Sequence, residues 1–165
     1  MKLISLKLTK AFRSLPDNFL ISFMNVEDYV DSDTFQPYCL VGLNGCGKSN
    51  VLEALSHIFF HLELCVGIHL PEQFLNGGSF RPEECVIDGF ELNYLHCSTE
   101  NTNVEKSEIE LVRITKAKGK APEMFVSYPF RNDENKHEVS LIPMRNVGLP
   151  AKGKKYLPKN VVAYS

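Results

Sequence analysis

Two short stretches near the N-terminus alternate apolar and polar side chains. This period of two is typical of a β-strand with one buried face. Pro16, Asp17 and Asn18 lie between the stretches and favour a turn. The pattern therefore predicts an N-terminal β-hairpin. Its apolar positions are Ile4, Leu6 and Leu8 in the first strand and Phe19, Ile21 and Phe23 in the second.

The period changes to that of a helix after Lys48. Apolar residues then recur at steps of three and four, which indicates an amphipathic helix of about four to five turns. Gly67 and Pro71 mark its far end. The continuous apolar run YCLVG at residues 38–42 leads into the glycine-rich segment before the helix. This run predicts a strand buried on both faces. The helical stripe consists of Val51, Leu52, Leu55, Ile58, Phe59, Leu62 and Cys65.

More strands are predicted in the second half of the chain. Residues 86–94 alternate, and SEIELVRIT (107–115) and EMFVSY (123–128) have strand composition, with the basic turn KAKGKAP between them. This indicates an antiparallel β part over residues 80–130. Residues 140–160 are rich in Pro, Gly and Lys and predict a flexible basic loop.

Together these elements predict one α/β domain over residues 1–165. Residues 1–66 would hold the hairpin, the glycine-rich loop and one long helix, and the sheet would be mixed, with an antiparallel part added to it. A length of 165 residues is enough for one domain with its own core.

Composition narrows the class of protein only slightly. Hydrophobic residues make up 44% and charged residues 23%, as in ordinary soluble domains, and the net charge of −2 gives no overall attraction to nucleic acid or membrane. The apolar runs are too short to span a bilayer, and five cysteines without a CxxC pair fit a reducing cytoplasm. Two basic segments, residues 116–120 and 151–159, are either solvated loops or contacts for DNA phosphates.

The segment Gly42–Ser49 carries the clearest chemistry. It reads GLNGCGKS and satisfies the spacing GxxxxGK[ST]. Glycines at these positions let consecutive backbone N–H groups point inward and surround phosphates, and the helix that follows adds its N-terminal partial charge. Lys48 can reach the β- and γ-phosphates, and the Ser49 hydroxyl can bind Mg²⁺. The predicted strand before the loop and helix after it are the context that this motif requires.

Two motifs together resemble a known family. GLNGCGKSNVLEAL at residues 42–55 is similar to the pattern G-x-N-G-x-G-K-S-N-[LV]-L-[ED]-A-[LI] of ABC-class ATPases of the SMC/RecF type. AFRSL at residues 11–15 resembles their N-terminal F-[RK]-[SN]-[FLY] motif. The likeness is greatest to bacterial AAA-family ATPases of restriction and anti-phage defence, and it is specific over about residues 1–65. It implies the N-terminal lobe of a P-loop NTPase.

The resemblance also implies roles for single residues. The nucleotide, ATP with Mg²⁺, would be wrapped by Asn44, Gly45, Cys46, Gly47, Lys48 and Ser49. Arg13 would lie near the nucleotide and contact its phosphates or base, and Asn50 and Glu53 would help to hold the first helix. Ser49 would bind Mg²⁺, and Gln73 is the candidate for the family's metal-contacting glutamine.

Other parts of the family's active site are not found in the sequence. No apolar run ends in Asp-Glu, the nearest match being CVID at residues 85–88, and no signature-like SGG or SGE occurs. No catalytic residue is therefore identified. We expect the N-terminal lobe of a longer ATPase, in which ATP-bound heads form a homodimer and slow hydrolysis acts on a partner nuclease or DNA. The alternatives are a diverged stand-alone binder that acts as a non-catalytic nucleotide-binding interaction module, and a P-loop kinase.

Two histidines on the predicted helix form a second candidate site. His57 and His61 are four residues apart, with Glu53 one turn earlier, so a metal pair is geometrically feasible. Both lie away from the Val51, Leu55 and Ile58 stripe. We therefore interpret them as solvated side chains.

Overall fold

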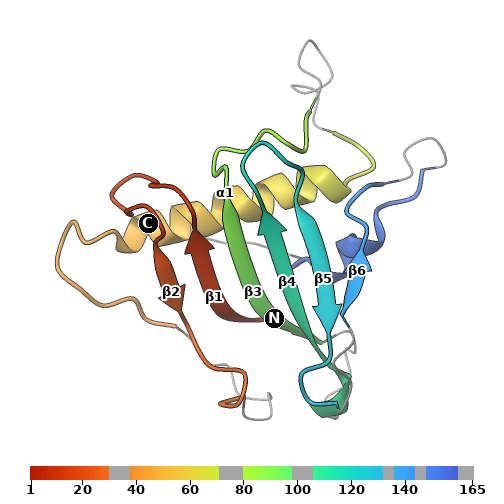
Figure 1. The fold of residues 1–165 in the computed structure, drawn as a ribbon, viewed down its shortest axis with the longest axis horizontal. Coiled ribbons are helices and arrows are strands. Elements are labelled where there is room, and N and C mark those ends of the chain that lie inside the picture. The colour runs from red at the N-terminus through yellow and green to blue at the C-terminus, as the bar shows by residue number, and fades with distance from the viewer. Residues whose placement is uncertain (30–37, 71–79, 98–105, 132–135, 144–147, 160–165) are drawn as a thin grey trace.

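The computed structural model describes residues 1–29, 38–70, 80–97, 106–131, 136–143 and 148–159. Their main feature is one antiparallel sheet of six strands with a single long helix across one face (Figure 1). The strand order is β2-β1-β3-β4-β5-β6. In chain order the elements are β1 (Lys2–Leu8), β2 (Leu20–Ser22), α1 (Lys48–Val66), β3 (Phe90–Cys97), η2 (Lys106–Glu108), β4 (Ile109–Lys116), β5 (Glu123–Ser127), β6 (His137–Val139) and η4 (Lys152–Tyr156).

The register of the sheet places apolar residues in a continuous row on the face toward α1. Leu6 of β1 pairs with Leu92 of β3, which pairs with Ile114 of β4, and Met124 of β5 continues the row. All four side chains are fully buried. Because side chains alternate between faces along a strand, this register places every second residue of β3, β4 and β5 on the core side. In β1 a register shift between Leu3 and Ser5 interrupts the alternation, and Ile4 packs in the apolar cluster of the other face.

Helix α1 covers that row with its apolar stripe. Its buried side chains include Val51, Ile58 and Leu62, and they join the strand residues in a single core cluster. The helix ends where Gly67 donates its backbone N–H to the carbonyl of Glu63 at 2.9 Å. The core thus fixes the position of both ends of α1.

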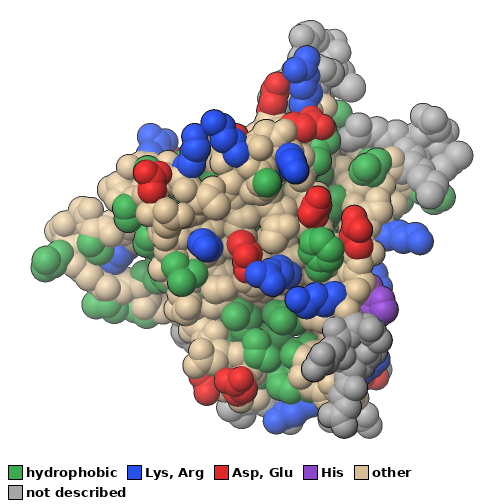
Figure 2. Space-filling view, viewed as in Figure 1, with side chains coloured by type: hydrophobic (Ala, Val, Ile, Leu, Met, Phe, Trp, Pro, Cys, Tyr) green, Lys and Arg blue, Asp and Glu red, His purple; other side chains and the backbone are tan. Residues whose placement is uncertain are grey.

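The opposite face of the sheet is polar over its middle (Figure 2). Arg113 donates to Glu91 at 2.7 Å, and Asn93 donates to Ser5 and to Glu91. A small second apolar cluster around Leu95 lies at one end of this face. Within the described parts of the chain, no helix has both the length and the apolar character needed to cross a membrane.

Most of the predicted elements are present. The hairpin forms between β1 and β2, α1 begins at Lys48 and ends before Gly67, and β3, β4 and β5 form the antiparallel part. The predicted mixed sheet is wrong for the described residues, because every strand pair there is antiparallel. The short edge strand β6 was not predicted.

The predicted strand at residues 38–42 is also wrong. This segment runs as a loop at the edge of the molecule (Figure 1), and Val41 is 88% exposed. Its first residue is anchored, because the Tyr38 hydroxyl donates to the carbonyl of Leu3 at 3.0 Å and the Tyr38 ring contacts Phe23. The run is apolar enough for a buried strand, but no described strand pairs with it.

Part of the predicted flexible basic loop at residues 140–160 is packed on the core. Element η4 lies in it, and Tyr156 and Leu157 are buried. Tyr94 of β3 donates its buried hydroxyl to the carbonyl of Tyr156 at 3.0 Å, and burial raises the pKa of Tyr94. The lysines of the segment remain on the surface, while its apolar residues anchor it.

Two leucines of α1 provide a matched test of this packing. Leu62 is fully buried, whereas Leu52, which the sequence pattern also placed in the stripe, is 37% exposed. We expect Leu62→Ala to lower the free energy of unfolding by about 2–5 kcal/mol, because it leaves a cavity in the core. Leu52→Ala is expected to cost less than about half as much. Urea unfolding of both variants measures the difference, and equal losses would contradict the assigned face of α1.

Candidate phosphate-binding site

The glycine-rich loop before α1 adopts a concave backbone conformation. Gly45 and Gly47 have φ angles of 83° and 94°, whereas Cys46 between them does not have a positive φ. Alternation of this kind turns successive backbone N–H groups to one side, as in anion-binding nests. Asn44, Gly45 and Cys46 are exposed, so the loop is open to a ligand.

The side chain of Lys48 folds back and binds backbone carbonyls at the start of the loop. Its Nζ donates to the carbonyl of Gly42 at 2.7 Å and to the carbonyl of Leu43 at 2.8 Å, and lies 3.7 Å from the Cys46 sulfur. The ammonium group is therefore held within the loop, where it adds positive charge to the backbone amides. A triphosphate in the loop would meet this charge directly.

The first turn of α1 completes the site. The helix begins at Lys48, after Gly47, and Val51 donates its N–H to the carbonyl of Gly47 at 3.0 Å. The amides before Val51 have no partner within the helix, which makes this end a favourable place for an anion. Ser49 lies in the same turn and is exposed. The amides of this turn and the Lys48 ammonium are groups that a phosphate would contact, although the strand expected before the loop is absent from the described residues.

A tight turn from the N-terminal hairpin packs against this loop. Phe12 and Leu15 exchange backbone hydrogen bonds of 3.0 and 2.9 Å, which closes the turn. A Cβ atom on Gly47 would lie 2.8 Å from the Leu15 side chain and 3.2 Å from the Ser14 hydroxyl. Asn50 of α1 donates its side-chain amide to that hydroxyl at 2.7 Å. The turn therefore touches both the loop and the helix.

Arg13 lies in the same turn and forms an ion pair with Glu53 of α1. Its Nη2 lies 2.7 Å from Oε1 of Glu53, and the hydrogen bond from Arg13 lowers the pKa of Glu53. Arg13 also has a positive φ of 54°, which is unusual for a residue other than glycine or asparagine. His57 lies 3.7 Å from the same carboxylate oxygen and packs edge-on against Phe12.

The structure brings together most of the residues that the sequence singled out. Residues 44–50 form one loop and helix start, and the turn carrying Arg13 lies against them. Gln73 lies outside the described residues. The contacts of Ser14 and Leu15 with the loop were missed, because only their place in the AFRSL motif marked them.

The interpretation of both helix histidines as solvated is wrong for His61. His61 is 5% exposed, its Nε2 lies 3.0 Å from the carbonyl of Pro82, and its ring contacts Phe80. Burial lowers the pKa of His61. The segment after residue 80 covers this part of α1, so the buried arc of the helix is wider than its apolar stripe. No group of three or more metal-binding side chains occurs among the residues described.

Asp88, the last residue of CVID, is committed to a structural contact. Its Oδ1 accepts hydrogen bonds from Nζ of Lys116 at 2.7 Å and from the backbone N–H of Gly119 at 2.9 Å. The Lys116 side chain is fully buried and also donates to the carbonyl of Glu83. Asp88 thus neutralises a buried cation.

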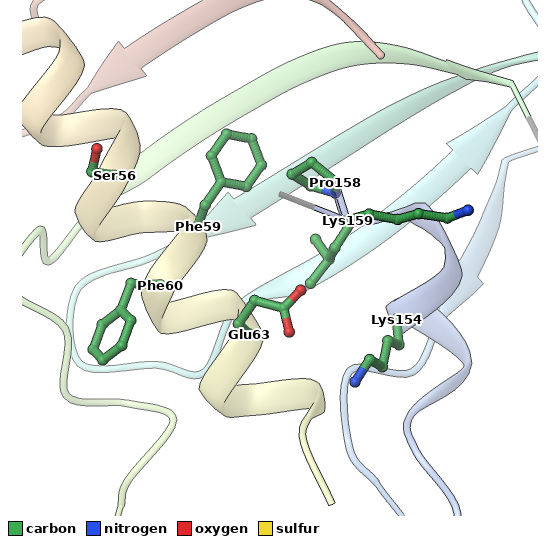
Figure 3. A pocket seen from close by; sticks show the side chains of 8 residues that line it. Ser56, Phe59, Phe60, Glu63, Lys154, Pro158 and Lys159 are labelled. Carbon is green, nitrogen blue, oxygen red and sulfur yellow. The ribbon is translucent and has the colours of Figure 1, made fainter. Parts of the chain in front are cut away.

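A separate hollow lies on α1 away from the loop (Figure 3). Its volume is about 510 Å³, and Phe59 and Phe60 contribute apolar surface. None of the residues predicted to bind nucleotide or metal lines it, whereas part of the basic segment 151–159 does. The residues around it are Ser56, Phe59, Phe60 and Glu63 from α1, and Lys154, Leu157, Pro158 and Lys159 from the C-terminal part of the described chain.

Comparisons of this chain with protein families, with curated proteins and with solved structures find no match. The geometry of the site itself therefore defines which chemistry it can support. That geometry offers a concave backbone loop, an enclosed lysine, a free helix N-terminus and an arginine-bearing turn at one end of α1.

Two loop glycines give a matched test of the turn contact. Gly47→Ala is expected to weaken both stability and phosphate binding, because its Cβ meets Leu15 at 2.8 Å and its φ is positive. Gly45→Ala has a positive φ but no atom within 4 Å of the new Cβ, so it reports the backbone cost alone. Thermal unfolding and binding of inorganic phosphate or ATP measure both. Equal effects would show that the Leu15 contact does not constrain the loop.

The Asp88–Lys116 pair predicts a pH dependence of stability. Hydrogen bonds from Lys116 and Gly119 lower the pKa of Asp88 in the folded protein. Its contribution is therefore complete above the unfolded pKa of about 3.9 and is lost as the pH falls through the lower folded pKa. Asp88→Asn should destabilise the protein most near neutral pH, and its deficit against wild type should shrink below about pH 4.

Glu84→Gln is the control for this experiment, because it neutralises a carboxylate in an ion pair whose side chains are 65% and 70% exposed. Urea unfolding from pH 7 to pH 3 gives both curves. A deficit of Asp88→Asn that stays constant over this range would contradict the assigned role of the carboxylate.

Proposed function

We propose that this chain binds ATP with Mg²⁺ at the loop formed by residues 42–49. The observation that supports this most directly is the enclosure of the Lys48 ammonium by the carbonyls of Gly42 and Leu43 under a concave, glycine-dependent backbone. A loop of this kind needs an anion of high charge to replace the internal contacts of the lysine. A triphosphate supplies it, and a monoanion does so only weakly.

The proposed roles follow from the positions of the residues. The backbone amides of residues 44–49 and Lys48 would hold the phosphates, Ser49 would bind Mg²⁺ through its hydroxyl, and Arg13 would contact the phosphates or the base. Asn50 acts indirectly, since its side chain holds Ser14 of the turn. Bound Mg²⁺ would neutralise part of the phosphate charge.

We also propose ATP-dependent association of two copies and slow hydrolysis, in bacterial DNA maintenance or anti-phage defence. The support for this wider role is the resemblance of residues 1–65 to SMC/RecF-type ATPases. The sequence contains no recognisable carboxylate base for activating water, so another chain or another segment would have to contribute one.

A second candidate function is that of a non-catalytic nucleotide-binding module. The observation that favours it concerns Asp88, the nearest match to a catalytic acidic strand end, which is engaged by Lys116 and Gly119. In that case nucleotide would stabilise the fold or an assembly without being consumed. Turnover of ATP by the purified chain that Ser49→Ala abolishes would contradict this alternative.

Replacement of Lys48 tests nucleotide binding directly. We expect Lys48→Ala to weaken binding of ATP–Mg²⁺ by at least about tenfold, because a charge-assisted contact to phosphate is lost. Ser49→Ala should reduce the gain in affinity that Mg²⁺ brings. Lys120→Ala, in the exposed turn between β4 and β5, removes the same charge and is expected to leave binding unchanged. Calorimetric titration measures all three, and wild-type affinity in Lys48→Ala would refute the site.

A further inference from the structure

The turn at residues 12–15 contains an unusual backbone conformation. Among the described residues, Arg13 and Asn18 are the two positions other than glycine with a positive φ. Asparagine tolerates this conformation, whereas arginine does not favour it. Glycine would adopt it without steric cost. Arginine in this conformation carries a backbone cost that contacts of its side chain would have to offset.

The side chain of Arg13 forms one ion pair but remains largely exposed to solvent. Its Nη2 contacts Oε1 of Glu53 at 2.7 Å, while 61% of the side chain is exposed. A guanidinium group carries five donors, and a single exposed carboxylate contact leaves it accessible to another anion. The contact with Glu53 is therefore strong enough to orient Arg13 and weak enough to be exchanged.

The position of this pair links it to the phosphate loop. Ser14 and Leu15, the next two residues, lie against Gly47, and Asn50 holds Ser14. Glu53 lies five residues after Lys48, which corresponds to about 7.5 Å along the axis of α1. Glu53 and a triphosphate in the loop would thus be anions on the same end of one helix. Arg13 contacts Glu53 and comes directly before Ser14, which lies against Gly47.

The carboxylate also has a second basic neighbour. His57 Nε2 lies 3.7 Å from the oxygen of Glu53 that Arg13 contacts. If Arg13 turned away, Glu53 would retain this neighbour on its own helix, one turn further along. Exchange of Arg13 would not leave an isolated carboxylate.

We propose that Glu53 is an internal competitor of the nucleotide for Arg13. It holds the guanidinium while the loop is free of nucleotide, and a bound triphosphate takes the guanidinium from it. This inference rests on the proposed nucleotide binding and adds a regulatory element to that site. The exchange would couple occupation of the loop to the turn, and through the turn to the N-terminal hairpin.

The central experiment measures ATP–Mg²⁺ affinity in Glu53→Gln. Removal of the competitor should tighten binding by about two- to fivefold, the range expected for loss of one exposed ion pair. The gain should shrink at high salt, because the competing interaction is screened. Glu84→Gln changes the net charge equally in an ion pair outside the loop and should leave affinity unchanged.

A double-mutant cycle distinguishes competition from a merely structural role. Arg13→Gln should weaken binding, and on that background Glu53→Gln should bring no further gain. If Glu53 only supports the fold, Glu53→Gln would weaken binding or leave it unchanged, and either outcome overturns the proposal. Arg13→Gly should be at least as stable as wild type and yet bind nucleotide more weakly; unchanged binding would equally overturn it.

Failure of the underlying function has a different signature. If wild-type protein shows no ATP binding, or Lys48→Ala binds as tightly as wild type, the nucleotide site itself is refuted, and with it the competition. If binding depends on Lys48 and Glu53→Gln does not tighten it, the site stands and only the role of Glu53 is refuted.

Discussion

Burial of the apolar face of α1 against the row Leu6, Leu92, Ile114 and Met124 is the interaction on which the rest of the structure depends. This contact sets where the helix lies on the sheet, and so where its N-terminus lies relative to the hairpin strands. The turn at residues 12–15 belongs to that hairpin. It therefore reaches the glycine-rich loop because the core aligns the two, although residues 15 and 47 are far apart in sequence.

The sequence predicted the elements whose pattern is set locally. Alternation identified β1, β2 and part of β3, and the three-four spacing identified α1, because one buried face leaves a periodic trace. Strand composition identified β4 and β5. The incorrect predictions have a common cause, which is that they depend on contacts distant in sequence. The run at residues 38–42 showed that its side chains are apolar, but periodicity contains no information about which strand would pair with it. His61 looked solvated because a helical stripe does not reveal a covering segment such as the one at Pro82.

The residues of the candidate site also fall into a part that the local sequence predicts and a part that depends on tertiary packing. Residues 42–49 could be recognised from sequence because backbone shape, lysine and helix start are all encoded within eight positions. The motif at residues 11–15 was found only through resemblance, and its contacts depend on tertiary packing that brings Leu15 to Gly47. The buried Lys116 had no signal at all, since a lysine in a basic turn reads as exposed until its partner Asp88 is located.

If the chain binds nucleotide as proposed, the phosphates replace the partners that Lys48 and Arg13 have in the free protein. A net charge of −2 gives no long-range attraction for a polyanion, so recognition must come from groups at the loop. Both cations there are already engaged, Lys48 by loop carbonyls and Arg13 by Glu53. Affinity is then the difference between phosphate contacts and the internal contacts they replace. The same internal contacts orient the Lys48 ammonium and the Arg13 guanidinium before a nucleotide binds, so these contacts shape the site as well as oppose its ligand.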